Sequence, residues 1–159
     1  PHVDLFLCET MSSAREGKNA VLAARQFATK KQPVWVSWTL ADNGDAGLRS
    51  GETILEAYQA VEAFEPDAFL FNCTDPQAIT RGLTELVALT DKPIGAYPNS
   101  FHVPDGWTLD NDIAVERRDM HIHEFVDFAD KWVDIGATIV GGCCGIGPDH
   151  INALSHQHH

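Results

Sequence analysis

The sequence has few basic residues for its length. Lys and Arg total 11 against 23 Asp and Glu in 159 residues, which gives a formal net charge of -12. A surface with this charge repels the phosphates of nucleic acids and the head groups of anionic membranes. We therefore expect neither a nucleic acid nor a membrane among the partners of this chain.

Long hydrophobic runs are also lacking. No apolar stretch approaches the roughly 20 residues that cross a bilayer, and the first residues, PHVDLFLCE, have neither the basic start nor the apolar core of a signal peptide. These absences predict a cytoplasmic protein. The length suits one domain, while the lack of an initial Met and the immediate start on an apolar run favour a portion of a larger one.

Cysteine is scarce, with four residues at positions 8, 73, 143 and 144. Four are too few for the disulfide framework of a small secreted domain, and neighbours such as Cys143 and Cys144 rarely bond each other because the peptide between them must distort. Metal binding or thiol redox chemistry is favoured instead. Cys8 lies within an apolar run, where cysteine is usually a buried packing residue.

Five apolar runs predict strands, at 3–9, 33–40, 67–73, 92–99 and 137–144. Continuous apolar runs are typical of parallel sheets that are buried on both faces. Between these runs, apolar residues at helical spacing predict helices at 52–64, at 75–89 and around 125–132, and Pro148 starts a last turn or helix. A first helix, running to about Lys30, is expected to begin with a capping box formed by Ser13 and Glu16.

This alternation of strands and helices predicts an α/β fold with a parallel sheet, and leaves open whether that sheet belongs to a barrel of the (β/α)8 TIM-barrel type. A complete barrel needs eight strands and typically about 250 residues, so about five βα units make only part of one. We assign residues 1–155 to this barrel portion. The last residues, 156–159, read HQHH and resemble the remnant of a tag.

Three of the cysteines are expected at one edge of the sheet. Cys73 ends the third run, while Cys143 and Cys144 end the fifth, and the carboxyl ends of parallel strands share one face. If those two strands are second neighbours, their inward side chains can converge. Three thiolates around Zn²⁺ leave the fourth tetrahedral position open, as in catalytic zinc sites. The glycines of GGCCGIGP, residues 141–148, would let the backbone turn sharply enough to direct both thiolates at one ion.

The segments FNCTDP, AYPNS and IVGGCCGIGPDHI resemble the homocysteine S-methyltransferase family, a zinc-dependent group. The resemblance extends from LCETM to GPDHI and corresponds to the second half of the family barrel. It implies that Cys73, Cys143 and Cys144 bind Zn²⁺ and that Glu9 binds the homocysteine ammonium. It also implies a methyl donor, either S-methylmethionine, S-adenosylmethionine or methyl-folate, and methionine as the product.

Other site residues follow from the same resemblance. Tyr97 and Asn99 belong to a loop that borders the family pocket, and we include them with Asn72 among the substrate-binding residues. Asn72 could instead orient Cys73 from behind. Thr10 stands where betaine users carry an aromatic residue, which favours a sulfonium or folate methyl donor.

Three alternatives remain open from the residues alone. Glu9 could cap the following helix near Ser12 and Ser13. The chain could be a noncatalytic zinc-thiolate or thiol-binding module, in which the metal stabilises an incomplete fold, or a redox protein that uses its adjacent cysteines. The first three strands of the family barrel have no counterpart here, so exposed sheet edges would need a missing N-terminal segment or self-association to cover them.

Overall fold

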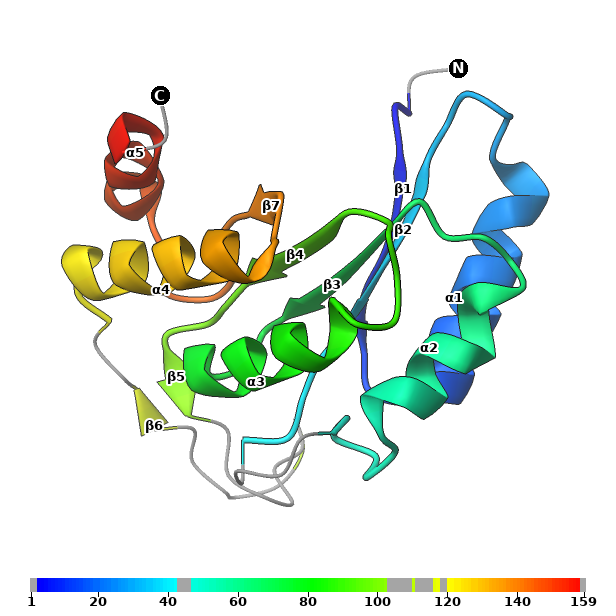
Figure 1. Ribbon diagram of the computed structural model, residues 1–159, viewed down its shortest axis with the longest axis horizontal. Coiled ribbons are helices and arrows are strands. Elements are labelled where there is room, and N and C mark those ends of the chain that lie inside the picture. The colour runs from blue at the N-terminus through cyan, green and yellow to red at the C-terminus, as the bar shows by residue number, and fades with distance from the viewer. Residues whose placement is uncertain (1–2, 43–46, 103–109, 111–115, 118–119, 158–159) are drawn as a thin grey trace.

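The computed structural model describes residues 3–42, 47–102, 110, 116–117 and 120–157. Strands and helices alternate along the chain (Figure 1). The elements are β1 (Phe6–Met11), α1 (Ala14–Phe27), β2 (Val34–Trp38), α2 (Ile54–Glu62), β3 (Ala68–Asn72), α3 (Pro76–Leu86), β4 (Ile94–Tyr97), β5 (Phe101–His102), β6 (Glu116–Arg117), α4 (Ile122–Ile135), β7 (Ile139–Val140) and α5 (Pro148–Gln157).

Five strands form one parallel sheet in the order β1-β2-β3-β4-β7. The predicted parallel α/β sheet is thereby confirmed, with each strand near its expected place. The antiparallel pair of β5 and β6 was not predicted, because two-residue strands carry no periodicity to read. Within the described residues, β1 and β7 each pair with one strand only, so both edges of the sheet are open.

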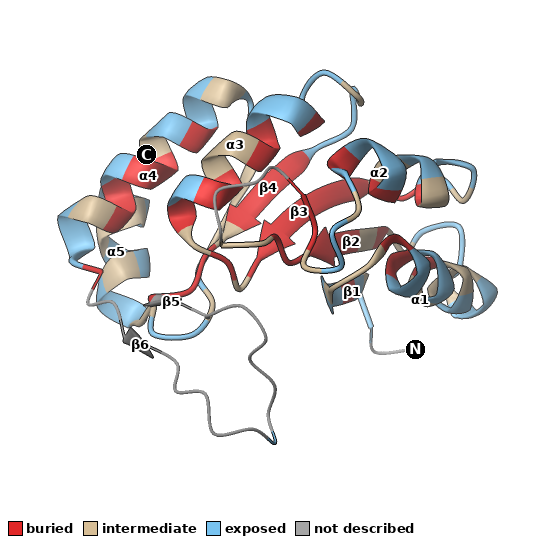
Figure 2. Ribbon diagram, turned by 90° about the horizontal axis from the view of Figure 1, so that it is seen from below, coloured by how far each residue is buried: buried red, intermediate tan, exposed pale blue. Residues whose placement is uncertain are grey.

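The sheet buries its two faces differently. Val36, Phe69 and Phe71 join the hydrophobic core that the strands share with the helices, which lie along one side of the sheet (Figure 2). Alternate residues of the same strands, such as Ser37 and Leu70, are also buried but point to the opposite face. That second face would line the interior if the sheet were closed into a barrel.

Helix caps differ in part from the expectation. Ser13 accepts a hydrogen bond from the Glu16 amide, as predicted, but the Glu16 carboxylate accepts from the Ser12 amide rather than from Ser13. The capping box is therefore incomplete there. A complete box begins α2, where Thr53 and Glu56 bond reciprocally.

The C-terminal helix packs on α4. Met120, Phe125 and Val126 form a small cluster with side chains of the last segment, and Gln157 Nε2 donates to Asp130 Oδ2 at 2.8 Å. The expected tag remnant at 156–159 thus begins inside α5, while residues 158–159 lie outside the described residues; its assignment stays a prediction. None of the described helices has both the length and the apolar character that a membrane span requires.

Candidate functional site

Three sulfur atoms meet at the carboxyl edge of the sheet. Cys73 Sγ lies 2.6 Å from Cys143 Sγ and 4.0 Å from Cys144 Sγ, and the two neighbouring cysteines are 3.9 Å apart at sulfur. All four cysteines are free thiols, and Cys8 is buried in β1 as expected. Residues about 70 positions apart in the chain therefore form one potential metal-binding cluster.

The strand order explains how the cysteines meet. Cys73 directly follows β3, the segment with Cys143 and Cys144 follows β7, and β4 lies between these two strands in the sheet. They are second neighbours, as the sequence argument required. Their side chains can therefore reach one point across the end of β4.

Backbone hydrogen bonds from the end of β4 hold both cysteine segments. The Cys73 amide donates to the Tyr97 carbonyl at 3.3 Å, and the Cys143 amide donates to the Pro98 carbonyl at 2.8 Å. The Ser100 amide in turn donates to the Cys144 carbonyl at 2.8 Å. Residues 97–100 thus join the two halves of the cysteine cluster.

The local backbone is unusual at both cysteine segments. Cys73 has φ 50°, in the left-handed region that L residues rarely adopt, and Gly145 has φ 81°. A Cβ on Gly142 would meet the Ile146 side chain at 2.2 Å, so only glycine fits at that position. These two glycines let the segment fold back over Cys143 and Cys144, which agrees with the role expected of the glycine run.

Arg49 is a site neighbour that the sequence argument missed. Its guanidinium donates to the Cys73 carbonyl at 3.3 Å and to the Thr39 hydroxyl, and lies 3.7 Å from Asp42. The loop after β2 thereby brings a positive charge beside the left-handed Cys73. No local pattern marked this residue, because its contacts are with segments distant in the sequence.

The three thiols of the cluster differ in pKa. The hydrogen bond from Cys73 lowers the pKa of Cys143 to about 6, despite partial burial. The same contact, followed by burial, raises the pKa of Cys73. Burial raises the pKa of Cys144, and the negative charge of Cys143 adds to the rise. Cys143 is therefore the thiol of the metal-free cluster that ionises first.

The donor set fits Zn²⁺. Two ligands on a tetrahedral zinc, each at about 2.3 Å, lie about 3.8 Å apart, close to the separations that involve Cys144. The Cys73–Cys143 pair would need to open by about 1.2 Å to reach that value. Three sulfur ligands leave one coordination position for a further ligand, and the exposed Cys144 leaves the cluster accessible.

Glu9 faces the same edge of the sheet from β1. Burial raises the pKa of Tyr97, and the Glu9 carboxylate adds to this rise and also opposes ionisation of Cys143. The Tyr97 hydroxyl is buried and lies near Ser37 and Glu9, although neither is placed for a well-formed hydrogen bond among the described residues. Glu9 and Tyr97 thus lie near the cysteines, where substrate-binding residues are expected.

The alternative role of Glu9 as a helix cap has no support in these contacts. Ser13 and Glu16 satisfy amides at the start of α1, and the Ala14 amide donates to the Glu52 carboxylate at 2.9 Å. The Glu9 side chain is exposed instead. It therefore remains available to a ligand.

Asn72 and Asn99 are buried close to the cluster. The Asn99 amide donates to the Thr74 carbonyl at 3.3 Å, which fixes the turn after β4. The Asn72 side chain is fully buried and bonds to Thr10 and Ser37. This burial favours the orienting role for Asn72 over a direct substrate contact.

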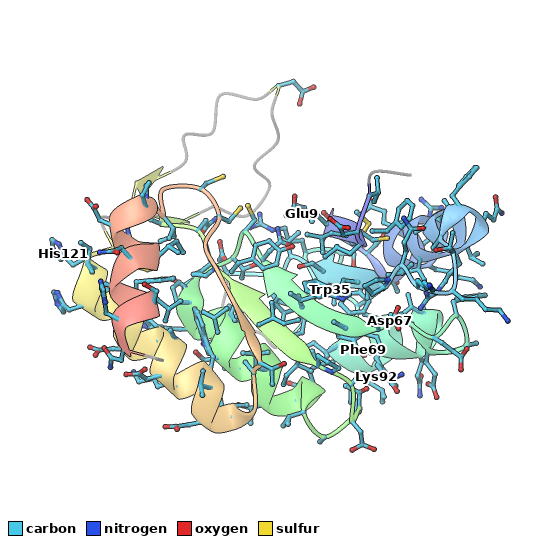
Figure 3. The ribbon with its side chains drawn as sticks, turned by 90° about the horizontal axis from the view of Figure 1, so that it is seen from above. Glu9, Trp35, Asp67, Phe69, Lys92 and His121 are labelled. Atoms are coloured by element: carbon cyan, nitrogen blue, oxygen red, sulfur yellow. The ribbon has the colours of Figure 1, made fainter. Side chains whose placement is uncertain are left out.

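Other polar groups and cavities lie elsewhere. His121, at the start of α4, is far from Glu9 in Figure 3. A cavity of about 650 Å³, lined by Phe69 and Lys92 among others, lies toward the amino ends of the strands. Neither contributes to the cysteine site.

The profile of the homocysteine S-methyltransferase family matches residues 1–158. The chain belongs to this family. It is 31% identical over 152 residues to homocysteine S-methyltransferase 2 of Arabidopsis thaliana, and 30% identical over 152 residues to selenocysteine Se-methyltransferase of Brassica oleracea var. italica. Each alignment covers 95% of this chain but only 44% and 42% of those relatives, so the chain spans less than half of their length.

Solved structures agree with this membership. The apo form of the homocysteine methyltransferase MmuM from Escherichia coli superposes with a TM-score of 0.75 at 25% identity, covering 98% of this chain and 51% of that one. Its metallated form superposes with a TM-score of 0.73. The five parallel strands are thus consistent with part of a TIM barrel, which confirms the predicted fold class.

The unequal thiols predict unequal alkylation of the metal-free protein. At pH 7 we expect iodoacetamide to modify Cys143 before Cys144, because the thiolate is the nucleophile and only Cys143 has a lowered pKa. Since protonation occurs below the pKa, the Cys143 rate should fall toward half near pH 6. Peptide mass spectrometry measures each site. Faster modification of the more exposed Cys144 at neutral pH would contradict the charge distribution.

Proposed function

We propose that this chain carries the zinc and homocysteine site of a methyltransferase that forms methionine. The observation that carries the proposal is the meeting of three thiols at the carboxyl edge of a parallel sheet in a member of the homocysteine S-methyltransferase family. Cys73, Cys143 and Cys144 would hold Zn²⁺. Bound there, the ion would supply the Lewis acidity that lowers the pKa of the homocysteine thiol and keeps it reactive at neutral pH.

The residues around the cluster would orient the substrate. Glu9 would bind the ammonium group by charge-assisted hydrogen bonds, which fixes the direction of the sulfur. Tyr97 and Asn99 would border the pocket from the end of β4.

Methyl transfer would begin with loss of the homocysteine thiol proton to solvent. A bond then forms between the sulfur and the methyl carbon, the bond from that carbon to the donor breaks, and its electron pair leaves with the donor. A sulfonium donor leaves as a neutral sulfide, whereas a methyl-folate takes up a proton from solvent as it leaves. The donor would be S-methylmethionine, S-adenosylmethionine or a methyl-folate. One of the relatives is named for methyl transfer to selenocysteine.

A noncatalytic zinc-thiolate module is the second candidate. It is supported by the open sheet edges and by the short coverage of the relatives, because part of a substrate pocket can lie in the portion that this chain lacks. Redox use is a third possibility. It would now involve Cys73 and Cys143, whose sulfurs are closer than those of the adjacent pair.

Replacing Cys73 with Ser tests the metal site. We expect the native chain to retain one zinc through gel filtration against a mild chelator, and Cys73→Ser to lose most of it, because a thiolate ligand is removed. Metal analysis by mass spectrometry measures the content. Methionine formed from homocysteine with each of the three donors should fall in parallel.

Cys8→Ala is the matched control, since it removes a thiol that lies in β1 away from the cluster. It should retain zinc. Zinc retained equally in Cys73→Ser would contradict the site, whereas zinc and homocysteine bound without methionine formation would favour the noncatalytic module.

Neutralising Glu9 tests the ammonium partner. We expect Glu9→Gln to weaken homocysteine binding about tenfold or more, because hydrogen bonds to charged groups contribute about 1.5–3 kcal/mol, and to leave the zinc content unchanged. Calorimetric titration of the zinc-loaded protein measures the Kd. Glu85→Gln, on the exposed side of α3, is the control. Loss of zinc in Glu9→Gln would show a structural role instead.

Under this proposal, further strands cover the two open edges of the sheet. We infer that residues 1–155 form one barrel portion, and that βα units equivalent to the share of the relatives that this chain does not cover pair with β1 and β7. Leu7 on β1 is 40% exposed and would then be covered. Because the cysteines are free thiols, we also propose a reducing, cytoplasmic compartment.

Light scattering tests whether further βα units cover the sheet edges. With a net charge of -12, the chain alone should remain near its monomer mass of 17.5 kDa, and it should form a one-to-one complex when co-expressed with the amino-terminal half of the Escherichia coli relative. A mass twice that of the monomer for the chain alone would favour self-association.

A further inference from the structure

Strand β1 contains a bulge next to the site. Cys8 lies opposite Val36 and Met11 opposite Trp38, so β1 has one residue more than β2 between these pairs. Glu9 and Thr10 occupy the irregular stretch, and Thr10 has φ 62°. A β-bulge interrupts the hydrogen-bond ladder and re-aims a side chain, often beside an active site. Here the bulge brings Met11 onto the core face that Cys8 occupies, and leaves Glu9 and Thr10 exposed at the end of the strand.

One amide side chain holds this bulge. Asn72 Oδ1 accepts from the Thr10 amide at 3.2 Å and from the Ser37 hydroxyl at 2.7 Å, while Asn72 Nδ2 donates to the Thr10 hydroxyl at 2.8 Å. The Thr10 N–H, which the irregular ladder leaves without a strand partner, is thereby satisfied. Asn72 is fully buried, so it ties β1, β2 and β3 together where they end.

The same residue is joined directly to the metal cluster. Cys73 follows Asn72 and has a left-handed backbone, held by the Tyr97 carbonyl on one side and by Arg49 on the other. A non-glycine residue keeps such a conformation only when its surroundings over-determine it. Cys73 is thus fixed by its own backbone bonds, while the Asn72 side chain fixes Thr10 and, through it, the bulge that contains Glu9.

We propose that Asn72 is a positioning residue that sets the placement of Glu9 relative to the cysteine cluster, and so matches the site to an amino acid with both a thiol and an ammonium group. This inference rests on the proposed function. Asn72 touches neither group itself. Its side-chain amide holds Thr10, and Thr10 is joined through the backbone to Glu9, whose carboxylate lies close enough to act on Cys143.

Asn72→Ala tests the proposal in the zinc-loaded chain. We expect zinc to remain bound, and the Kd for homocysteine to rise on the order of tenfold or more, as is typical when an outer-layer residue that orients a site is removed. Calorimetric titration gives the Kd. Thr80→Val is the matched control: it removes a partly buried hydroxyl that accepts from Trp132 Nε1 at 2.9 Å, away from the site. An unchanged Kd in Asn72→Ala would overturn the proposal.

A thiol ligand without the ammonium distinguishes positioning from general damage. For 4-mercaptobutanoate, which lacks that group, Asn72→Ala should bind as the native chain does. In a Glu9→Gln background, Asn72→Ala should add little further loss for homocysteine, because both changes remove the same contact. Equal losses for both ligands, or additive losses in the double variant, would show that Asn72 acts on substrate directly or only on stability.

Thr10→Ala serves if Asn72→Ala does not fold. Thr10 is an exposed residue, and this change removes its hydroxyl, which accepts from Asn72 Nδ2. The buried side-chain amide of Asn72 stays in place. The direction of its effect should be the same and smaller. No effect on homocysteine affinity in Thr10→Ala would then count against the proposal.

A substrate-independent measurement separates this inference from the proposed function. The Thr10 amide should exchange hydrogen slowly in the native chain and faster in Asn72→Ala, as followed by NMR. If the native chain binds no homocysteine but Thr10 shows this difference, the proposed function fails while the clamp on the bulge stands. If homocysteine binds and Thr10 exchange does not change, the clamp fails alone.

Discussion

The cysteine site depends on the backbone of residues 97–100, which lies between two chain segments that would otherwise not meet. Its carbonyls accept from Cys73 and Cys143, and its Ser100 amide donates to Cys144. Because main-chain groups make these bonds, they fix the positions of the cysteine backbones independently of the side chains nearby. The thiol separations of the cluster are therefore a consequence of strand order and of one short connection.

Three cysteines close together in an acidic protein are difficult to deprotonate together. Three cysteinates would repel one another, and in the metal-free cluster the hydrogen bond between Cys73 and Cys143 favours ionisation of Cys143 and opposes that of Cys73. A divalent cation compensates the charge when all three lose their protons. Arg49, which bonds to the Cys73 carbonyl, places a permanent positive charge beside the cluster.

Much of this arrangement could be predicted from local patterns. Continuous apolar runs located all five strands of the parallel sheet, and the glycines around Cys143 and Cys144 indicated a sharp turn at the site. Three other features could not be predicted: the bulge at Thr10, the contact of Arg49 with Cys73, and the antiparallel pair β5 and β6. Each arises from a pairing between distant segments, or from strands too short to show a period.

The sequence by itself determined the chemistry, because residue types carry it: cysteines that suit zinc, a carboxylate that suits an ammonium group, and an acidic surface that repels phosphates. Only the tertiary structure decided the geometry. It gave Glu9, Thr10 and Asn72 different roles. Glu9 is exposed, Thr10 lies in the bulge of β1, and Asn72 is buried beneath that bulge. The reason is physical: a side chain's role follows from its burial and hydrogen-bond partners, and those are set by which strands lie next to each other.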